Sequence, residues 1–578
     1  MSNYSVRLII RALLLALLLL ACGASALAQT PSPTPANPVP QATPALQEPR
    51  QPNFPEVQQQ AVPPQPDLTR LGVSSSSVVA LSLNDAIRRA LQNNNDIEVA
   101  RDDVRVAEQR LRALYGVYDP VFSVTPSFDQ RISPVTSIFA GGTSSGTVSN
   151  KTLTVSPSIS KIFSTGGGSY QLTFNNTKTT TSATSSTLNP FYSSNLSLLY
   201  TQPLLRNRSI DANRRSIRIQ KKLVAQTDSD FRQRTITIIS QVQAAYWNLV
   251  FALRNQQNQL DSLNLSRQNM RNIEAQISAG AKAPLDRAQV LTDIATRESA
   301  LFLAAQSVST AENSLKQLML KDPQSSEWSA QITPTDVPAF DLTPVDLKGA
   351  LDDAHKNRPE LGRLNLQKEI NGIDLQYYKN QTRPQIDLTG ALTTTGLAGT
   401  KVVCIPDPVT GKTCPIVPTN LIGGYGQDIS NLSGFSTREI NVGVAISFPI
   451  HNRAAAANLA AARIQRDQLQ ASYRSQDQAI EMDVRNAAQA VDTAQRRAVA
   501  SRLARESAEQ QLAGEQKLYE VGRSTTFLLL QRQNELTAAR TNELQAQTDY
   551  NKALADLQRA TSATLRVNNV VVENPAKP

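Results

Sequence analysis

The stretch LNDAI at residues 83–87 recurs as LKGAL at residues 347–351. At the same offset, Pro120 falls on Pro384, and the correspondence continues almost to the C-terminus. Each half therefore repeats the same order of parts. A duplication of this length predicts two structurally equivalent halves that build one body, and we expect the function to lie in what the pair encloses.

The composition of the 578-residue chain favours an elongated architecture over large compact cores. Aromatic residues make up only 5% of the chain and the mean hydropathy is -0.30, both low for a large buried interior. The net charge is +10, but the basic residues are interleaved with Asp, Glu and Gln along predicted helices. This pattern is typical of solvated helix faces, so we expect no nucleic-acid partner.

The N-terminus predicts export from the cytoplasm. Arg7 and Arg11 precede an apolar run, and Ala26-Leu27-Ala28 follows it with the small-x-small pattern of a signal-peptidase site. We therefore interpret residues 1–28 as a signal peptide. A second interpretation stays open, because Leu19-Leu20-Ala21-Cys22 resembles a lipoprotein box in which Cys22 becomes the lipidated first residue.

Residues 29–77 are rich in Pro, Gln, Ser and Ala, a composition that cannot bury enough apolar surface to offset the entropy of ordering. We interpret them as a disordered leader. After the signal peptide we identify no run of about 18 apolar residues, which argues against an ordinary transmembrane helix. Any membrane crossing is then expected to use strands.

Export also places the chain in an oxidising compartment. Cys404 and Cys414 flank a Pro- and Gly-containing stretch and are expected to form a disulfide there. The alternative is a pair of free thiols in a loop.

Segments with period-two alternation lie between the helical parts of each half. Ile440, Val442 and Val444, for example, alternate with small or polar residues. An apolar side opposite a small or polar side is the signature of a membrane β-barrel strand, although a soluble sandwich strand has the same pattern. We place the strands at about residues 120–204 in the first half and about 384–449 in the second.

Two proline-free stretches, at about residues 209–279 and 453–521, predict unusually long helices. At 1.5 Å per residue, each spans roughly 105 Å. Six apolar residues of the second stretch step by four and three, which predicts a heptad seam for close helix packing. They are Ile480, Val484, Ala487, Val491, Ala494 and Ala498.

Each long helix is expected to turn near a glycine and return as a shorter helix, so the hairpins cover about residues 209–320 and 453–563. The short helices before the strands, stacked end to end with the return helices, nearly match the long helices in length. The first repeat is thus residues 81–344, including a linker after its hairpin, and the second is residues 345–565. Residues 566–578 form a C-terminal tail.

The strand sets sit between helices, so each half crosses the membrane an even number of times. The second half supplies two crossings. The first half supplies two or four, because the strand pair at residues 153–174 either joins the set or forms an external hairpin. So few strands cannot close a barrel, and open edges in lipid leave backbone groups unsatisfied at several kcal/mol each. Several copies must therefore share one barrel.

Over residues 81–565 the chain resembles the TolC-type outer-membrane efflux protein family. The resemblance lies in the duplication, in the order of strands and helices, and in local motifs. These are Ala245-Tyr246-Trp247 in the first long helix and Tyr519-Glu520-Val521-Gly522-Arg523-Ser524-Thr525 at the second hairpin tip.

The resemblance implies a mixed α and β fold. Duplicated helical hairpins would form a coiled-coil-like tunnel through the periplasm, and antiparallel strands would form an outer-membrane barrel. A homotrimer would complete both, with twelve strands, or more if the extra hairpin joins. The implied function is a passive exit duct of a tripartite efflux or type I secretion system. Its partners would be outer-membrane lipid, a periplasmic adaptor (membrane fusion) protein and an inner-membrane pump.

The resemblance also assigns roles to the hairpin tips. The turn Val521-Gly522-Arg523-Ser524 is expected to contact the adaptor, and the turn that contains Ser278 and Gly280 is its counterpart in the first half. Family members close their tunnels by hydrogen bonds between neighbouring coils at the tips. By its spacing from the tip glycines, the pair Asp286 and Tyr519 matches one such link. The acidic constriction of the family falls on Leu528 and Gln531 here, so that part of its gate is missing.

The sequence carries no recognisable catalytic or cofactor motif. Its two histidines, His355 and His451, are far apart and have no plausible metal ligands near them in sequence. We therefore expect neither an enzyme nor a cofactor or metal site. The alternative from another class is a periplasmic coiled-coil scaffold or adaptor without a pore, which the apolar strand faces disfavour.

Overall fold

A computed structural model describes residues 64–571 apart from residues 136–140, 339, 342 and 404–415. The predicted signal peptide, the leader up to residue 63, and the candidate modification sites Cys22, Cys404 and Cys414 lie outside the described residues.

The first repeat contains short helices, four strands and a long hairpin, in the predicted order. The elements are α2 (Leu83–Asn93), α3 (Asn95–Tyr115), η1 (Gly116–Tyr118), β2 (Val121–Pro134), β3 (Thr147–Ile162), β4 (Ser169–Thr181), β5 (Leu188–Pro203), α4 (Ala212–Ser278) and α5 (Pro284–Met319). They follow β1 (Ser74–Leu81) and precede η3 (Ser326–Ser329) and β6 (Ala330–Pro334).

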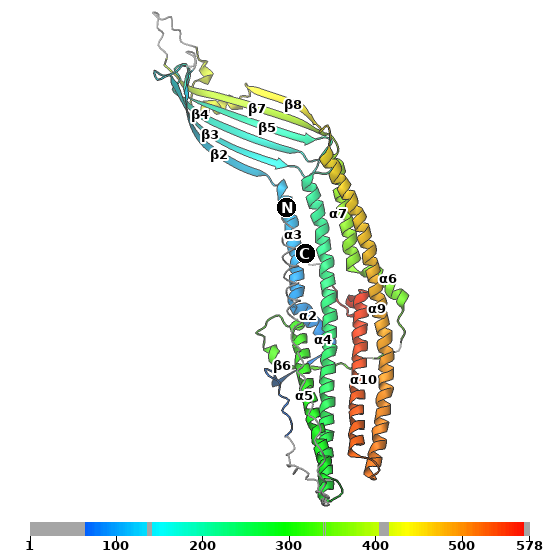
Figure 1. Cartoon of the computed structure of the whole chain (residues 1–578). Coiled ribbons are helices and arrows are strands. Elements are labelled where there is room, and N and C mark those ends of the chain that lie inside the picture. Colours follow the sequence, from blue (N-terminus) through cyan, green and yellow to red (C-terminus); the bar gives the residue numbers. More distant parts are fainter. Residues whose placement is uncertain (1–63, 136–140, 339, 342, 404–415, 572–578) are drawn as a thin grey trace, which may run out of the picture. The chain divides into compact units, whose positions relative to one another are not determined.

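The second repeat has the same outline with two strands instead of four. It contains α6 (Leu347–Asn357), α7 (Pro359–Gln381), β7 (Gln385–Lys401), η4 (Thr419–Leu421), α8 (Tyr425–Ser433), β8 (Arg438–Ser447), α9 (Arg453–Glu520), α10 (Thr526–Ala560) and α11 (Thr564–Val567). Figure 1 shows α4 and α9 running beside their shorter partners α5 and α10.

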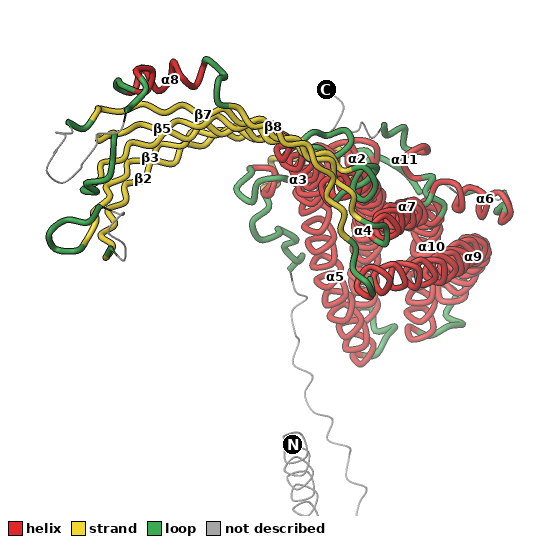
Figure 2. Tube along the Cα trace, turned by 90° about the horizontal axis from the view of Figure 1, so that it is seen from above, coloured by secondary structure: helices red, strands yellow, loops and turns green. Residues whose placement is uncertain are grey.

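The strands of both repeats form one antiparallel sheet in the order β2-β3-β4-β5-β7-β8. The β3–β4 hairpin lies inside the sheet, so the question that the sequence left open is answered for this chain. Helix α8 packs over β5 and β7 (Figure 2). Its fully buried Asp428 accepts a hydrogen bond from the Ser194 backbone N–H at 3.2 Å. The helix backbone also lies close to Gly396 of β7. A Cβ atom on residue 396 would lie 2.2 Å from the Asp428 carbonyl oxygen.

The helix boundaries agree with the predicted hairpins to within three residues. The six residues of the predicted heptad seam in α9 are all buried, which confirms the seam. In α4 the predicted motif residue Tyr246 is fully buried and donates to the carboxylate of Asp336 at 2.6 Å. Asp336 in turn accepts the backbone N–H of Leu83 at 2.7 Å, so the motif ties α4 to the linker and to the start of α2.

The two repeats form equivalent hydrogen bonds where a short helix meets the end of a return helix. Asn94 caps α3 and donates from Nδ2 to the carbonyl of Leu318, in the last turn of α5, at 3.0 Å. At the equivalent position, Arg358 precedes α7 and donates from Nε to the carbonyl of Ala560, at the end of α10, at 2.8 Å. The broken helices therefore stack on the return helices in both halves.

The second junction adds a charge network that the first lacks at the equivalent position. Arg358 and Arg559 both pair with Asp483 of α9, and Arg559 lies 3.2 Å from it. Burial alone raises the pKa of Asp483, but the hydrogen bonds from Arg358 and Arg559 outweigh it and hold the pKa below its usual range.

This network predicts an acid-sensitive junction. The stabilisation by Asp483 is fully present above the unfolded pKa of about 4 and is lost as the pH falls through the lower folded value. We expect hydrogen-exchange protection around residues 354–361 to fall in this acidic range in the native protein. Asp483→Asn should show lower protection at neutral pH and a weaker acid dependence. An unchanged pH dependence in the variant would contradict this assignment.

Two sequence predictions need correction. The predicted leader ends too late, because residues 64–73, here called the strap, pack on the first hairpin. The carbonyl of Pro64 accepts from Arg267 at 2.7 Å, and Leu68 packs against the core between α4 and α5. The next segment, β1, pairs in parallel with β6, a sheet that the sequence did not predict.

Leu565, at the end of the second repeat, and Val570, in the predicted tail, both pack against the main core. Finally, α4 contains an 18-residue window of mean hydropathy 1.3, long and apolar enough to cross a membrane. About three fifths of that window (61%) is buried inside the structure. Neighbouring apolar residues of α4 form the core with α2, α3 and α5, so packing explains this apolar stretch.

Candidate functional site

The two faces of the sheet differ in chemistry from edge to edge. One register row places an apolar residue of each strand side by side: Phe122, Ile159, Leu172, Leu198, Leu392 and Ile440. The next row, on the opposite face, consists of Ser123, Ser158, Thr173, Ser197, Thr393 and Glu439. The apolar side chains of the edge strands are largely exposed, at 68% for both Phe122 and Ile440. An apolar surface of this extent marks a site of contact with lipid or protein.

Both hairpins reverse at their tips through the same backbone motif. In the first, Gly280 has a φ of 72° and donates to Ile277, while Ala281 donates to Gln276. In the second, Gly522 has a φ of 74° and donates to Tyr519, while Arg523 donates to Leu518. This paired bonding defines the Schellman motif, and its left-handed position favours glycine.

The tips expose the side chains that a partner would contact. Val521 and Arg523 are exposed, and Ser278 is exposed with its hydroxyl bonded to the carbonyl of Ala275 at 2.8 Å. Ser524 is half-buried because its hydroxyl bonds to Glu515 of α9. The sequence reasoning missed two further apolar tip residues, Leu285 and Phe527, which are 76% and 60% exposed.

The predicted gate pair is not joined within this single chain. Tyr519 and Asp286 share no hydrogen bond in the part of the chain that the structure describes. Instead, Lys282 Nζ lies 4.8 Å from the centroid of the Tyr519 ring and 3.4 Å from the hydroxyl of buried Thr526. Lys282 thus links the first tip to both helices of the second hairpin. Sequence reasoning missed it, although a lysine two residues after the turn glycine was visible.

Farther from the tips, the two hairpins meet through a polar seam. Its hydrogen bonds join Asn258 to Thr541 at 2.9 Å, Ser262 to Thr537 at 3.1 Å, Asn269 to Gln533 at 2.8 Å and Arg297 to Asn534 at 2.9 Å. Each such bond contributes only about 0.5–1.5 kcal/mol net, because water can replace either partner. These polar contacts are therefore more easily rearranged than the apolar packing of the hairpins, to which Leu530 of α10 also contributes against α4 and α5.

The sheet and the helical hairpins also occur together in a known protein family. Residues 350–563 match the model of the family described as "Outer membrane efflux protein". The second repeat forms an outer membrane efflux protein domain. The predicted resemblance to this family is confirmed, and proteins of the class are channels rather than enzymes. A comparison with curated protein sequences found no match.

Solved structures extend the likeness beyond this efflux protein domain. The CmeC outer membrane channel of Campylobacter jejuni is 16% identical over 84% of this chain and 89% of its own, with a TM-score of 0.57. VceC of Vibrio cholerae is 15% identical over 83% and 95%, also with a TM-score of 0.57. The open state of MtrE from Neisseria gonorrhoeae is 17% identical over 83% and 88%, with a TM-score of 0.55. These matches confirm the predicted fold class of helical tunnel and antiparallel strands.

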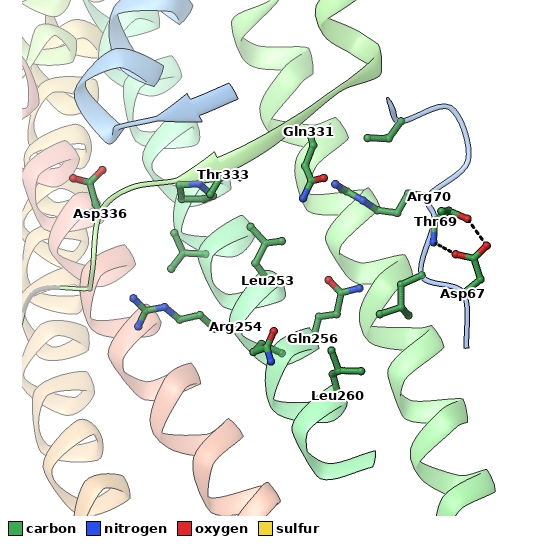
Figure 3. A pocket seen from close by; sticks show the side chains of 15 residues that line it. Asp67, Thr69, Arg70, Leu253, Arg254, Gln256, Leu260, Gln331, Thr333 and Asp336 are labelled. Atoms are coloured by element: carbon green, nitrogen blue, oxygen red, sulfur yellow. Dashed lines mark hydrogen bonds between the residues drawn. The ribbon is translucent and has the colours of Figure 1, made fainter. Parts of the chain in front are cut away.

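A cavity on the first hairpin has a volume of about 690 Å³. It lies between the strap, α4 and β6, and its lining mixes polar and apolar side chains (Figure 3). Thr69 donates from its backbone and its hydroxyl to Asp67, at 2.8 and 2.9 Å, which lowers the pKa of that carboxyl. Among the described residues, no group of three or more His, Cys, Asp or Glu is placed to hold a metal ion.

Proposed function

We propose that the chain is the outer-membrane exit duct of a tripartite efflux or type I secretion system. In this proposal a homotrimer forms a barrel that continues into a periplasmic tunnel. An inner-membrane pump delivers cargo through an adaptor bound at the hairpin tips. The observation that carries the proposal is one sheet with an exposed apolar face whose strands lead directly into two long helical hairpins.

The apolar face supports lipid as the partner of the sheet. A non-pore periplasmic scaffold would leave residues such as Phe122 and Ile440 in water, at a cost of about 25 cal/mol for each Å² of apolar surface. The polar opposite face suits a water-filled lumen. The family match supports the outer membrane as the location.

The test is fractionation combined with electrophysiology. We expect a heat-modifiable trimer in outer-membrane fractions, and we expect the purified trimer to conduct ions in planar bilayers. A soluble, monomeric periplasmic species would overturn the proposal.

The tips give a second prediction. A photo-crosslinking residue at Val521 should capture a periplasmic adaptor protein in cells that contain the whole system. Val521→Asp should reduce the yield of this complex at least tenfold, because the charge must be desolvated on docking. Val499→Asp is the matched control, since Val499 is an exposed apolar residue of α9 outside the tip. Equal losses in both variants would remove the tips as the docking site.

A further inference from the structure

The sheet has six strands in each copy because the β3–β4 hairpin lies between β2 and β5. The hairpin is fully integrated: β3 pairs with β2 from Thr147 to Ser160, and β4 pairs with β5 from Ser169 to Thr179. Both β3 and β4 therefore have neighbours on both sides.

The two edges of this sheet are free in the described chain. Strands β2 and β8 each pair on one side only, with β3 and β7 respectively. Every neighbouring pair is antiparallel and the number of strands is even, so β2 and β8 run in opposite directions. A β8 edge can therefore pair antiparallel with the β2 edge of a second copy.

The chemistry of the faces is matched across this junction. Ile440 of β8 and Phe122 of β2 end the same apolar row, and Glu439 and Ser123 end the same polar row. Pairing β8 with β2 continues both faces without interruption. Unpaired edges cost several kcal/mol per backbone group in lipid, so closure is strongly favoured.

We propose that three copies of this chain close a barrel of eighteen strands through β8–β2 pairing. The proposal rests on the proposed function and its threefold assembly. Four strands per copy would give twelve strands; the inserted β3–β4 hairpin adds two per copy while the helical hairpins stay the same in number.

The added strands widen the exit in the outer membrane. With a strand spacing of about 4.8 Å and a tilt of about 40°, eighteen strands enclose a backbone diameter of about 36 Å. Twelve strands under the same assumptions enclose about 24 Å. The polar row that would line this lumen is rich in Ser and Thr. The barrel is therefore suited to bulky hydrated cargo and selects weakly by charge.

Disulfide mapping between copies tests the junction. In a background with Cys404→Ser and Cys414→Ser, Phe128→Cys in β2 is combined in turn with Cys at Ile440, Val442, Val444 or Ile446 of β8. At least one pair should give a reducible ladder up to the trimer in purified outer membranes, because opposed residues of paired strands lie about 5 Å apart.

Two controls separate the alternatives. Val442→Cys with Leu172→Cys should give no crosslink, since Leu172 lies in β4, an interior strand. Val124→Cys with Leu196→Cys should also give none, because three strand spacings, about 14 Å, separate β2 from β5. An intrachain crosslink of that second pair would show that the hairpin lies outside a twelve-stranded barrel.

Native mass spectrometry of the purified channel completes the test. Three copies are expected; two copies would give twelve strands and overturn the proposal. A conducting trimer that yields none of the four β2–β8 crosslinks would overturn the eighteen-stranded barrel and leave the exit duct intact. A soluble monomer would overturn the proposed function itself.

Discussion

Replacing Glu312 by leucine should weaken the attachment of the strap and β6 to α5 by about 3–5 kcal/mol, the usual cost of breaking a buried ion pair. Glu312 and Lys316 are each 1% exposed and lie 2.6 Å apart. The second oxygen of Glu312 pairs with Arg70 of the strap at 2.7 Å. Lys316 also donates to the carbonyls of Trp328 and Ala330, at 2.7 and 2.6 Å. Without Glu312, the ammonium of Lys316 stays buried with no opposite charge.

Hydrogen exchange in detergent is the suitable measurement, because a chain of this size is not expected to unfold in one step. Protection of residues 64–81 and 326–334 should fall on the order of a hundredfold or more, at about 1.4 kcal/mol per factor of ten. Glu312→Leu combined with Lys316→Met should recover part of the loss, since the buried ammonium of Lys316 is removed and only Arg70 is left without its partner.

The matched control is Glu98→Leu. Glu98 pairs with Lys321 at 2.6 Å, but both side chains are about half exposed, so this pair contributes at most about 1 kcal/mol. Equal losses of protection in the Glu98 and Glu312 variants would contradict a special role for the buried cluster.

If the hairpin tips close the proposed tunnel, replacing Lys282 by methionine should favour its open state. The cation–π contact with Tyr519 contributes about 0.5–1 kcal/mol at a partly exposed site. The hydrogen bond to Thr526 contributes about 0.5–1.5 kcal/mol. If three copies open together, these contributions sum to about 3–7.5 kcal/mol, and the ratio of open to closed channels rises at least about a hundredfold. Single-channel recording in planar bilayers should show at least a tenfold longer open time.

Variants of Tyr519 distinguish this contact from the predicted link to Asp286. Tyr519→Phe keeps the aromatic ring and removes the hydroxyl. If Tyr519 bonds to Asp286 of a neighbouring coil, Tyr519→Phe should raise the leak conductance. If the ring contact with Lys282 holds the tip closed, Tyr519→Phe should conduct like the native protein and Tyr519→Leu should leak.

Lys348→Met controls for the loss of one positive charge, since Lys348 is exposed on α6. A leak in that variant equal to the leak of Lys282→Met would remove the tip contact as the cause.

The helical hairpins were predictable because their signals are local and long. No proline interrupts α4 or α9 after the first turn, and the seam from Ile480 to Ala498 has the period of a packed helix. The strands were predictable from alternation, although their order in the sheet required the structure. The heptad seam and the turn glycines were both placed correctly from sequence.

The missed features depend on contacts between distant segments. The polar run at the start of β1 carries no strand pattern, and its pairing with β6 joins residues far apart in the chain. Helix α8 is short and follows a glycine pair, so its sequence looks like a loop until Asp428 is seen buried against the sheet. The role of Lys282 depends on its contacts with Tyr519 at the end of α9 and Thr526 at the start of α10, which lie far from it in sequence.

The matched junctions at Asn94 and Arg358 have a consequence for the assembled tube. The amide at Asn94 forms neutral hydrogen bonds, which ionic strength barely affects, whereas the network of Arg358 and Asp483 is about one third exposed at Asp483 and is screened by salt. The exposed pairs Arg234–Asp96 and Lys321–Glu98 at the first junction are also screened, so both kinds of joint would weaken in concentrated salt. The second joint would lose more, because Asp483 holds both Arg358 and Arg559 there. Around a threefold axis, a ring built from six similar hairpins would therefore soften unequally at alternate joints, and its mechanical symmetry would be threefold.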